Sequence, residues 1–402
     1  MATPVSELEL PVVDGADRGE RRDQIDAARE QHWLARAPMG YLLTRYEDCV
    51  KVLRDARWFS ALALLNQTRG IDDPRMTERQ RPSILSTEGT EHLRLRKLVG
   101  PAFTPKQADS MRPLMREVVE GLVDPIAERG RSEFVTDVCD PYPIPIICAM
   151  VGAPREDWQL FSRLATSVFR FFDEDARDHV DEIVEARLEM DAYVTALIEE
   201  RRAAPADDLL TDLIRVEEEG DRLSDTELLS LVEALILAGT DTTRNQLACS
   251  VALFARHPDQ WRLLAERPEL APRAVEETMR HLGAIRGTGR YASEDIEYRD
   301  VAFPTGTLMF PSFTSANHDP DLWADAEVFD ITAERGKAQL TFGSGIHFCL
   351  GASLARAELQ EAFLVLSRRL PDLELDGDIT WKPDGTGIWG PAELPIRFAP
   401  GH

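Results

Sequence analysis

Apolar residues recur at helical spacing along most of the chain, and the longest such pattern runs from about Asp225 to Ala255. Ser224 and Glu227 form a capping-box pattern at its start, and Pro258 bounds its other end. At ~1.5 Å per residue this helix would be roughly 46 Å long, enough to cross the molecule. Its centre, LVEALILAGTDTT, is apolar on nearly every side, which predicts that the helix is buried.

Two further helices and a strand-rich stretch are expected toward the C-terminus. The spacing of apolar residues predicts helices over roughly Ala271–His281 and Leu350–Arg369, and Pro371 stops the second. From Tyr291 to Pro311 apolar and polar residues alternate as in strands, with turn signals between them. The expected fold class is therefore mainly α with a small, discontinuous β portion.

The N-terminal residues carry the weakest pattern. A helical stretch is expected only around Gln24–Leu34, and a short strand is expected at Tyr41–Thr44, so roughly residues 1–40 are predicted to form a less ordered lead-in. The length of 402 residues, taken alone, predicts two or three domains. No internal repeat and no convincing linker divides the chain.

The chain is strongly acidic, with a formal net charge of −25. This charge argues against general nucleic-acid binding and against attraction to anionic membrane surfaces. The chain has no run of about 18 apolar residues that could span a membrane, and its polar N-terminus lacks the apolar core of a signal peptide. A cytoplasmic protein is therefore expected. Basic residues still cluster locally, at Arg94, Arg96, Lys97 and Lys106.

One of the five cysteines, Cys349, lies in an unusual loop, TFGSGIHFCLG. It comes directly before the Leu350–Arg369 helix, where free backbone N–H groups and the helix dipole are expected to lower its pKa and favour a thiolate. Gly343 and Gly345 permit a tight turn, and Gly351 would let the helix pack close to a flat ligand. A structural cysteine is the alternative, but it does not explain why these residues stand at fixed offsets.

The loop resembles the haem-binding signature of the cytochrome P450 family, FGxGxHxCxG. The pattern is filled without departure by Phe342, Gly343, Gly345, His347, Cys349 and Gly351. The resemblance, which extends from about Tyr41 to the C-terminus, implies that the Cys349 thiolate is the axial ligand of the iron in haem b (iron protoporphyrin IX). It also implies a single domain over residues 1–402, the cytochrome P450 fold wrapped around one haem.

Asp241 and Thr242 stand in the middle of the long apolar helix. A buried acid and alcohol are costly unless they have a partner or a role. One reading is a polar pair that contacts a neighbouring helix. The resemblance implies another, in which the pair lies over the distal face of the haem, Thr242 assists dioxygen activation and Asp241 relays protons. Thr242 can also bond back to a helix carbonyl, and Gly239 weakens the helix nearby.

Four donors are expected at the haem propionates. His92 and Arg96 lie at i and i+4 on one helical face, which by itself indicates only a basic helix surface. The surrounding sequence resembles a family helix that grips a propionate, and this implies binding by His92 and Arg96, joined by Arg290 and His347. Four donors for two carboxylates are electrostatically reasonable.

Glu277 and Arg280 have an ExxR spacing, and such i,i+3 pairs usually lie on a solvated surface. The resemblance implies instead a structural ion pair on the proximal side of the haem, with an arginine as third partner. Arg335 is the candidate, although it follows Phe329 later than the family pattern does. Arg286 is compatible with the substrate pocket, with solvent or with the haem edge.

The resemblance implies a monooxygenase that activates O₂ with two electrons and hydroxylates or epoxidises an apolar small molecule. No flavin- or nicotinamide-binding domain fits in the chain, so separate proteins must supply the electrons. A ferredoxin, served by a ferredoxin reductase, is expected to dock near the cysteine loop and Arg94–Lys97, and the protein is expected to be a monomer. The alternatives are a peroxide-using haem-thiolate hydroxylase, which needs no proton relay, and a non-catalytic haem-binding sensor.

Overall fold

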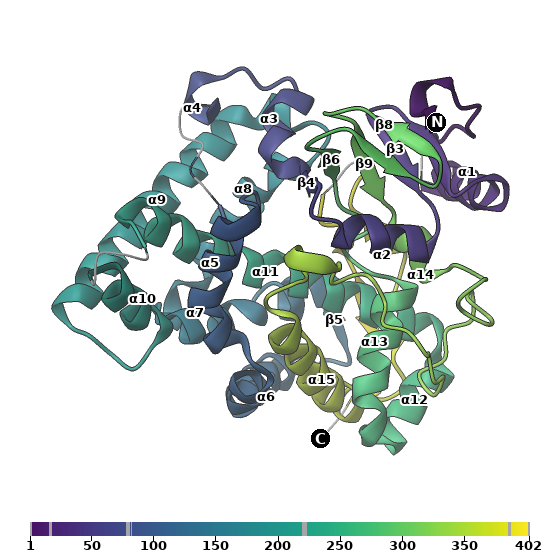
Figure 1. Cartoon of the computed structure of the whole chain (residues 1–402). Coiled ribbons are helices and arrows are strands. Elements are labelled where there is room, and N and C mark those ends of the chain that lie inside the picture. The colour runs from purple at the N-terminus through teal and green to yellow at the C-terminus, as the bar shows by residue number, and fades with distance from the viewer. Residues whose placement is uncertain are drawn as a thin grey trace.

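The computed structural model describes residues 2–15, 18–77, 81, 83–218, 223–384 and 387–400, and helices dominate it (Figure 1). The longest helix, α11 (Asp225–Arg256), runs through the middle of the molecule, as predicted. Its capping box is present, because Ser224 and Glu227 each bond the backbone N–H of the other. The helices packed against it include α7 (Pro143–Val151), α8 (Trp158–Phe169), α9 (Val180–Ala203), α13 (Ala271–His281) and α15 (Ala352–Arg369).

The remaining helices surround this group. The longer ones are α1 (Arg18–Gln31), α2 (Tyr46–Arg54), α5 (Gly89–Val99), α6 (Pro105–Ala127), α10 (Leu209–Glu218) and α12 (Pro258–Glu266). The short ones are α3 (Leu65–Thr68), α4 (Pro74–Thr77) and α14 (Phe313–Asn317). Pro105, Pro143 and Pro258 each begin a helix, where the missing N–H of proline costs no intrahelical bond.

The predicted helices differ from the observed ones mainly at their starts. The helix over Ala271–His281 is confirmed, and the C-terminal one begins at Ala352, two residues later than expected. The N-terminal helix begins earlier than expected, at Arg18, and ends at Gln31. The first turns of this helix are charged, and only a few of its residues belong to the apolar cluster beside it. The apolar pattern therefore predicted only the second half of the helix.

The strands form small separate sheets, which confirms the discontinuous β portion. The largest has the order β2 (Leu34–Ala37), β3 (Gly40–Leu43), β9 (Leu308–Pro311), β6 (Arg290–Ala292) and β4 (Trp58–Ser60). The others are β1 (Thr3–Pro4) with β8 (Val301–Phe303) and β7 (Ile296–Tyr298); β10 (Glu374–Leu375) with β13 (Pro395–Arg397) and β5 (Arg131–Glu133); and β11 (Thr380–Trp381) with β12 (Pro391–Glu393).

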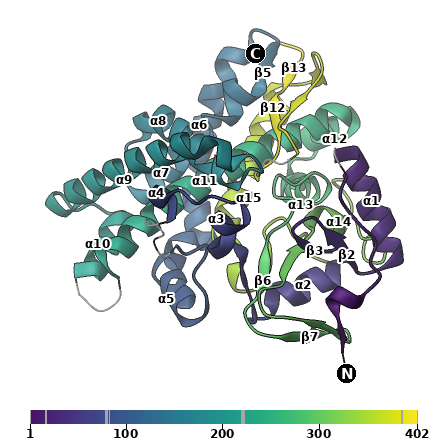
Figure 2. The same cartoon turned by 90° about the horizontal axis from the view of Figure 1, so that it is seen from above.

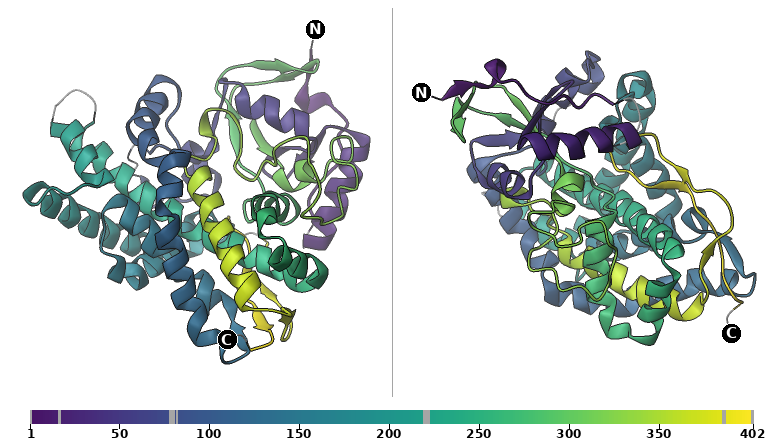
Figure 3. Two further views of the ribbon diagram at one scale, coloured as in Figure 1. Left: turned by 90° about the horizontal axis from the view of Figure 1, so that it is seen from below. Right: turned by 90° about the vertical axis from the view of Figure 1, so that its right-hand side faces the viewer.

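Two apolar clusters hold these parts together. The larger lies between the helices and includes Phe254, Trp261 and Phe363, and the smaller lies against the largest sheet and includes Trp58 and Phe303. Figures 2 and 3 show this sheet on one side of α11 and α8, α9 and α10 on the other. Across the described part of the chain, no helix has the length and apolar character needed to cross a membrane.

Candidate active site

The cysteine loop folds back on itself just before α15. The Cys349 N–H donates to the Phe342 carbonyl at 2.9 Å. Gly343 and Gly345 have φ values of 71° and 74°, a left-handed conformation that favours glycine. A side chain at Gly345 would also overlap the Leu53 carbonyl at the end of α2. The two glycines therefore fix the turn that presents Cys349, as the sequence predicted.

The environment of Cys349 differs from the expectation in one respect. Burial raises the pKa of the thiol, while the Gly351 N–H and the guanidinium groups of Arg96 and Arg356 act in the opposite direction. The prediction of a lowered pKa is therefore wrong for this thiol, because desolvation outweighs the helix N-terminus and both cations. The N–H group and the two cations remain placed to stabilise a thiolate once its proton is lost.

Three of the four predicted propionate donors gather at this loop. The His92 Nε2 lies 3.0 Å from the Ile346 carbonyl oxygen, and Arg96 donates to the Phe348 carbonyl at 2.7 Å. The rings of His92 and His347 are 4.2 Å apart between their centroids. Helix α5 therefore lies along the cysteine loop, although the two segments are about 250 residues apart in the chain.

Arg290, the fourth predicted donor, begins β6 beside Ser60 of β4. Its side chain is buried, and it donates to the Gly289 carbonyl at 2.9 Å. Glu88, the N-cap residue of α5, links this strand to the loop: its Oε1 accepts from the Ser60 N–H at 2.5 Å and lies 2.9 Å from the His347 Nε2. Burial raises the pKa of Glu88, but these two contacts lower it overall.

The donors around the loop suit the propionates of a haem. The His92 Nδ1 is buried and has no hydrogen-bond partner among the described residues. Burial also lowers the pKa values of His92, Arg96 and Arg290, because their charged forms lack water. A nearby carboxylate would offset that cost. Glu88 was not predicted from the sequence, although its place four residues before His92 puts it next to the same helical face.

The middle of α11 has one open face. Ala238 is exposed and Thr242 is partly exposed, whereas every residue from 243 to 254 is buried. The Thr242 Oγ1 donates to the Ala238 carbonyl at 2.8 Å, so the predicted back-bond is confirmed. Gly239 faces another way, since a Cβ there would overlap Ile147 of α7. Thr242 thus borders an open face in the middle of α11, next to a stretch in which every residue is buried.

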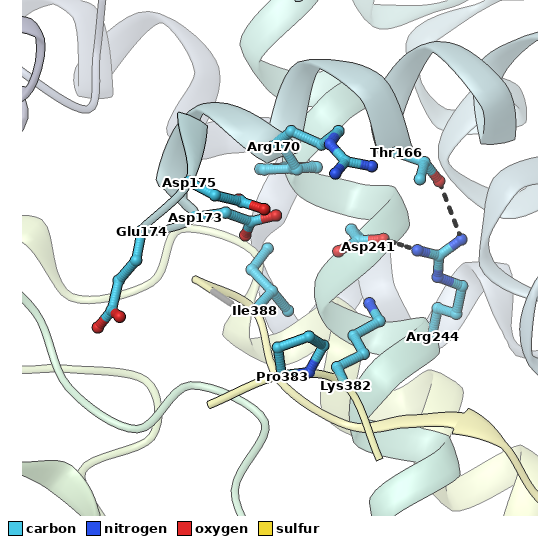
Figure 4. A pocket seen from close by; sticks show the side chains of 11 residues that line it. Thr166, Arg170, Asp173, Glu174, Asp175, Asp241, Arg244, Lys382, Pro383 and Ile388 are labelled. Atoms are coloured by element: carbon cyan, nitrogen blue, oxygen red, sulfur yellow. Dashed lines mark hydrogen bonds and ion pairs between the residues drawn. The ribbon is translucent and has the colours of Figure 1, made fainter. Parts of the chain in front are cut away.

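Asp241 lies on a different side of α11 from Thr242, because successive helical residues are about 100° apart. Its carboxylate accepts hydrogen bonds from Arg244 and, at 3.2 Å, from Asn245. Arg244 also pairs with Asp140 at 3.3 Å. Asp241 and Thr242 are adjacent in sequence, but Asp241 is bound by Arg244 and lines a cavity that Thr242 does not line (Figure 4).

The ExxR pair forms a buried three-residue network. Glu277 accepts from Arg280 at 2.8 Å and from Arg335 at 2.8 Å, so Arg335 completes the network. Burial raises the pKa of Glu277, and the two arginines more than reverse this. Arg280 also donates to the backbone carbonyls of Asn317, Ala326 and Val328. The surface-bridge reading does not hold, because Glu277 and Arg280 are only 3% and 2% exposed.

Arg286 and Glu358 are two further polar groups near α11 whose contacts the structure shows. Arg286 donates to the Asp384 carbonyl at 2.5 Å and stacks over Trp389, so it contacts the C-terminal loop. Glu358 of α15 accepts from Thr243 at 3.0 Å, and its other oxygen is buried without a partner in the described structure. Burial raises the pKa of Glu358 to about 8. No sequence pattern pointed to Glu358, since one acid in an amphipathic helix usually faces solvent.

Known proteins resemble this chain along nearly all of its length. The family model for cytochrome P450 matches residues 66–376. Luteothin monooxygenase of Streptomyces thioluteus is 37% identical over 401 residues, which cover 98% of each chain. Mycinamicin IV hydroxylase/epoxidase of Micromonospora griseorubida is 38% identical over 371 residues, covering 90% of this chain and 91% of the relative.

Solved structures agree with these matches. The crystal structure of CalO2 superposes with a TM-score of 0.89 at 28% identity, covering 98% of this chain and all of the other. P450BioI, solved with a hexadec-9Z-enoic acid ligated acyl carrier protein, gives a TM-score of 0.86 at 31% identity, covering 94% and 98%. The family match and the relatives show that this protein belongs to the cytochrome P450 family, whose members bind haem b through a cysteine thiolate and act as monooxygenases.

Proposed function

We propose that the protein inserts one oxygen atom from O₂ into an apolar small molecule, by hydroxylation or epoxidation. The observation that carries the proposal is the cysteine loop, where Cys349 stands just before α15 and His92, Arg96 and His347 gather around it. The acid–alcohol pair of α11 supports O₂ rather than peroxide as the oxidant, because a peroxide-using hydroxylase needs no proton relay.

The roles proposed for the side chains follow from their positions. Cys349 would ligate the haem iron, His92, Arg96, Arg290 and His347 would hold the propionates, and Phe342, Gly343 and Gly351 shape the loop that carries Cys349. When bound, the haem supplies the oxygen-activating chemistry. Thr242 borders the open face of α11 and positions a proton there, and Asp241 relays protons to it from the cavity side.

Separate redox partners are proposed to supply the electrons, a ferredoxin and its reductase. Arg96 touches the cysteine loop through Phe348, whose side chain is 40% exposed, so a partner that docks here comes close to the Cys349 thiol. Arg94 is already paired with Glu91 and Glu227. Lys97 and Lys106 are therefore the better candidates for binding an acidic partner.

The substrate, the oligomeric state and the location in the cell are proposed on weaker signals than the chemistry is. Relatives solved with myristic acid and with a C16 acyl chain bind long apolar molecules, which favours an apolar substrate here too. We propose a single domain that acts as a monomer in the cytoplasm.

Isotopic labelling tests the proposal directly. Purified protein, reconstituted with haem, ferredoxin and reductase, is screened against apolar compounds for a spin-state change, and each binder is then oxidised under ¹⁸O₂. One labelled oxygen atom in the product is the expected result. Product that forms only from added peroxide and carries peroxide oxygen would establish the alternative hydroxylase. Binding of haem without any oxidised product across the screen would favour the sensor.

A further inference from the structure

A cavity of about 420 Å³ lies against α11 on the side of Asp241 (Figure 4). Its walls come from three parts of the chain: the end of α8 with the segment that follows it, the middle of α11, and the C-terminal loop after β11. Apolar side chains form part of the lining, among them Phe169, Pro383 and Ile388. Thr166 and charged groups form the rest, so the cavity can hold water against Asp241.

Lys382 enters this cavity from the C-terminal loop. Its backbone is fixed, because its N–H donates to the Gly390 carbonyl at 3.0 Å and its carbonyl accepts from the Trp389 indole at 3.0 Å. Figure 4 shows its ammonium group directed toward Asp241. Within the described residues, no hydrogen bond or ion pair engages that ammonium group. Arg244, by contrast, is bound to Asp241 and also reaches Asp140.

The cations of the cavity differ in what they can do with a proton. Arg170 and Arg244 are guanidinium groups, which stay charged in proteins. Lys382 is an amine, and burial lowers its pKa although nearby acids oppose the change. Burial also raises the pKa values of Asp140 and Asp173. The pKa of the lysine and the pKa values of the two acids thus shift toward one another, which makes proton exchange between these groups easier.

We infer that Lys382 is a positioning residue that delivers protons from the water of this cavity to Asp241. The inference rests on the proposed function, in which Asp241 relays protons toward Thr242. In the step, an N–H bond of the Lys382 ammonium breaks and an O–H bond forms on the Asp241 carboxyl by way of cavity water. The amine is then protonated again by a proton that bulk solvent supplies through the cavity water, so one proton moves inward and no electron moves.

The charged groups around Lys382 set the pH range in which it can act. They are Asp241 and Arg244 of α11, Asp140 before α7, and Arg170, Asp173, Glu174 and Asp175 after α8. The acids hold the proton on Lys382 and Arg244 repels it. The lysine delivers protons while it is charged, so delivery declines as the pH rises through the lowered pKa of Lys382.

Two substitutions at Lys382 separate proton delivery from charge. Lys382→Arg keeps the positive charge but cannot release a proton, and Lys382→Met removes both. Both variants are expected to lower the share of electrons recovered in product, and the turnover, by about tenfold at neutral pH, and to flatten the decline toward high pH. Lys337→Met is the matched control, because Lys337 pairs with Glu47 of α2 away from this cavity. Wild-type coupling and pH profile in Lys382→Arg would overturn the inference.

A second measurement does not depend on turnover. The chain has five lysines, so acylation followed by mass spectrometry can give the apparent pKa of each in the haem-loaded protein. Lys382 is expected to react at the lowest pH, and Asp241→Asn is expected to lower its apparent pKa further while leaving the other four unchanged. An unchanged Lys382 in Asp241→Asn would overturn the link between the two residues.

The Asp241→Asn variant also separates this inference from the proposed function. Uncoupling in Asp241→Asn, together with normal coupling in both Lys382 variants, would overturn the inference alone. Normal coupling in Asp241→Asn would overturn the proposed relay and the inference with it. Uncoupling in all three variants supports both.

Discussion

Two regions that pack near α11 hold buried charged groups, but in one region these groups have several partners and in the other they have few. In the network that joins α13 to Arg335, the Glu277 carboxylate meets two guanidinium groups, and Arg280 also donates to backbone carbonyls. On the cavity side, Lys382 has no described partner, and Asp140 shares Arg244 with Asp241.

The difference matches two physical requirements. A buried ion pair with all its partners holds one geometry and resists a change of protonation, because breaking it leaves an unpaired charge. A buried group with too few partners has a shifted pKa and can exchange a proton near neutral pH. The first arrangement suits the support of the cysteine loop, and the second suits proton delivery to α11.

Removal of the thiol should have the largest effect. Cys349→Ala leaves the fold of α15 in place but removes the proposed iron ligand, so monooxygenation should be lost. The reduced carbonyl complex should also lose the strongly red-shifted Soret band of thiolate ligation. Cys148→Ala is the control, because Cys148 is buried in α7 and should leave the band unchanged. A red-shifted band in Cys349→Ala would contradict the assignment.

Breaking the proximal network should mainly cost stability. Glu277→Gln leaves two arginines without their carboxylate, and the expected loss is ~3–5 kcal/mol in the free energy of unfolding. Urea denaturation of the haem-loaded protein measures it. Glu189→Gln breaks the exposed pair with Arg163 and should cost less than ~1 kcal/mol. Equal losses in the two variants would mean that the network is not the rigid support described above.

On the open face of α11, loss of a hydroxyl should change chemistry more than stability. Thr242→Ala should lower the share of electrons recovered in product by about tenfold and raise peroxide release. Thr240 makes the same back-bond, to Ile236 at 2.8 Å, but it is fully buried. Thr240→Ala should therefore alter the unfolding free energy and leave coupling intact. Peroxide assays on both variants decide whether the open face matters.

Glu358 should make stability depend on pH. Its pKa is raised to about 8 by burial, so the folded protein keeps this proton at pH values where the unfolded chain has lost it. Stability should therefore fall as the pH rises from about 4, the value for an unfolded glutamate, to about 8. Glu358→Gln cannot ionise and should reduce this fall, as measured by denaturation at several pH values. A fall of the same size in Glu358→Gln would assign it to other groups.

The smallest effect is expected at the redox-partner surface. Lys97→Glu should slow reduction by a ferredoxin roughly two- to fivefold at low salt, and less at high salt, because exposed charges steer association. Stopped-flow reduction at two ionic strengths measures it. Lys337→Glu serves as the control, because Lys337 pairs with Glu47 of α2 and is not among the basic residues proposed to bind the partner. A rate that is unchanged and insensitive to salt would place the docking surface elsewhere.

The sequence alone determined the helices and the chemistry that depends on short spacing. Apolar periodicity gave α11 and α13, because a buried helix needs an apolar stripe at a period of 3.6 residues. The glycines of the cysteine loop could also be predicted from the sequence, because a left-handed turn needs glycine at set positions. The early start of α1 could not be predicted, since its first turns are charged and carry no apolar pattern.

The pairing of distant groups depends on the folded chain. Glu88 with His347, Arg335 with Glu277 and Thr243 with Glu358 are joined across 58 to 259 residues of chain. Burial likewise decided the raised pKa of Cys349, which local sequence had suggested would fall. Desolvation and pairing depend on what other elements bring to a site, and no spacing within one segment records that.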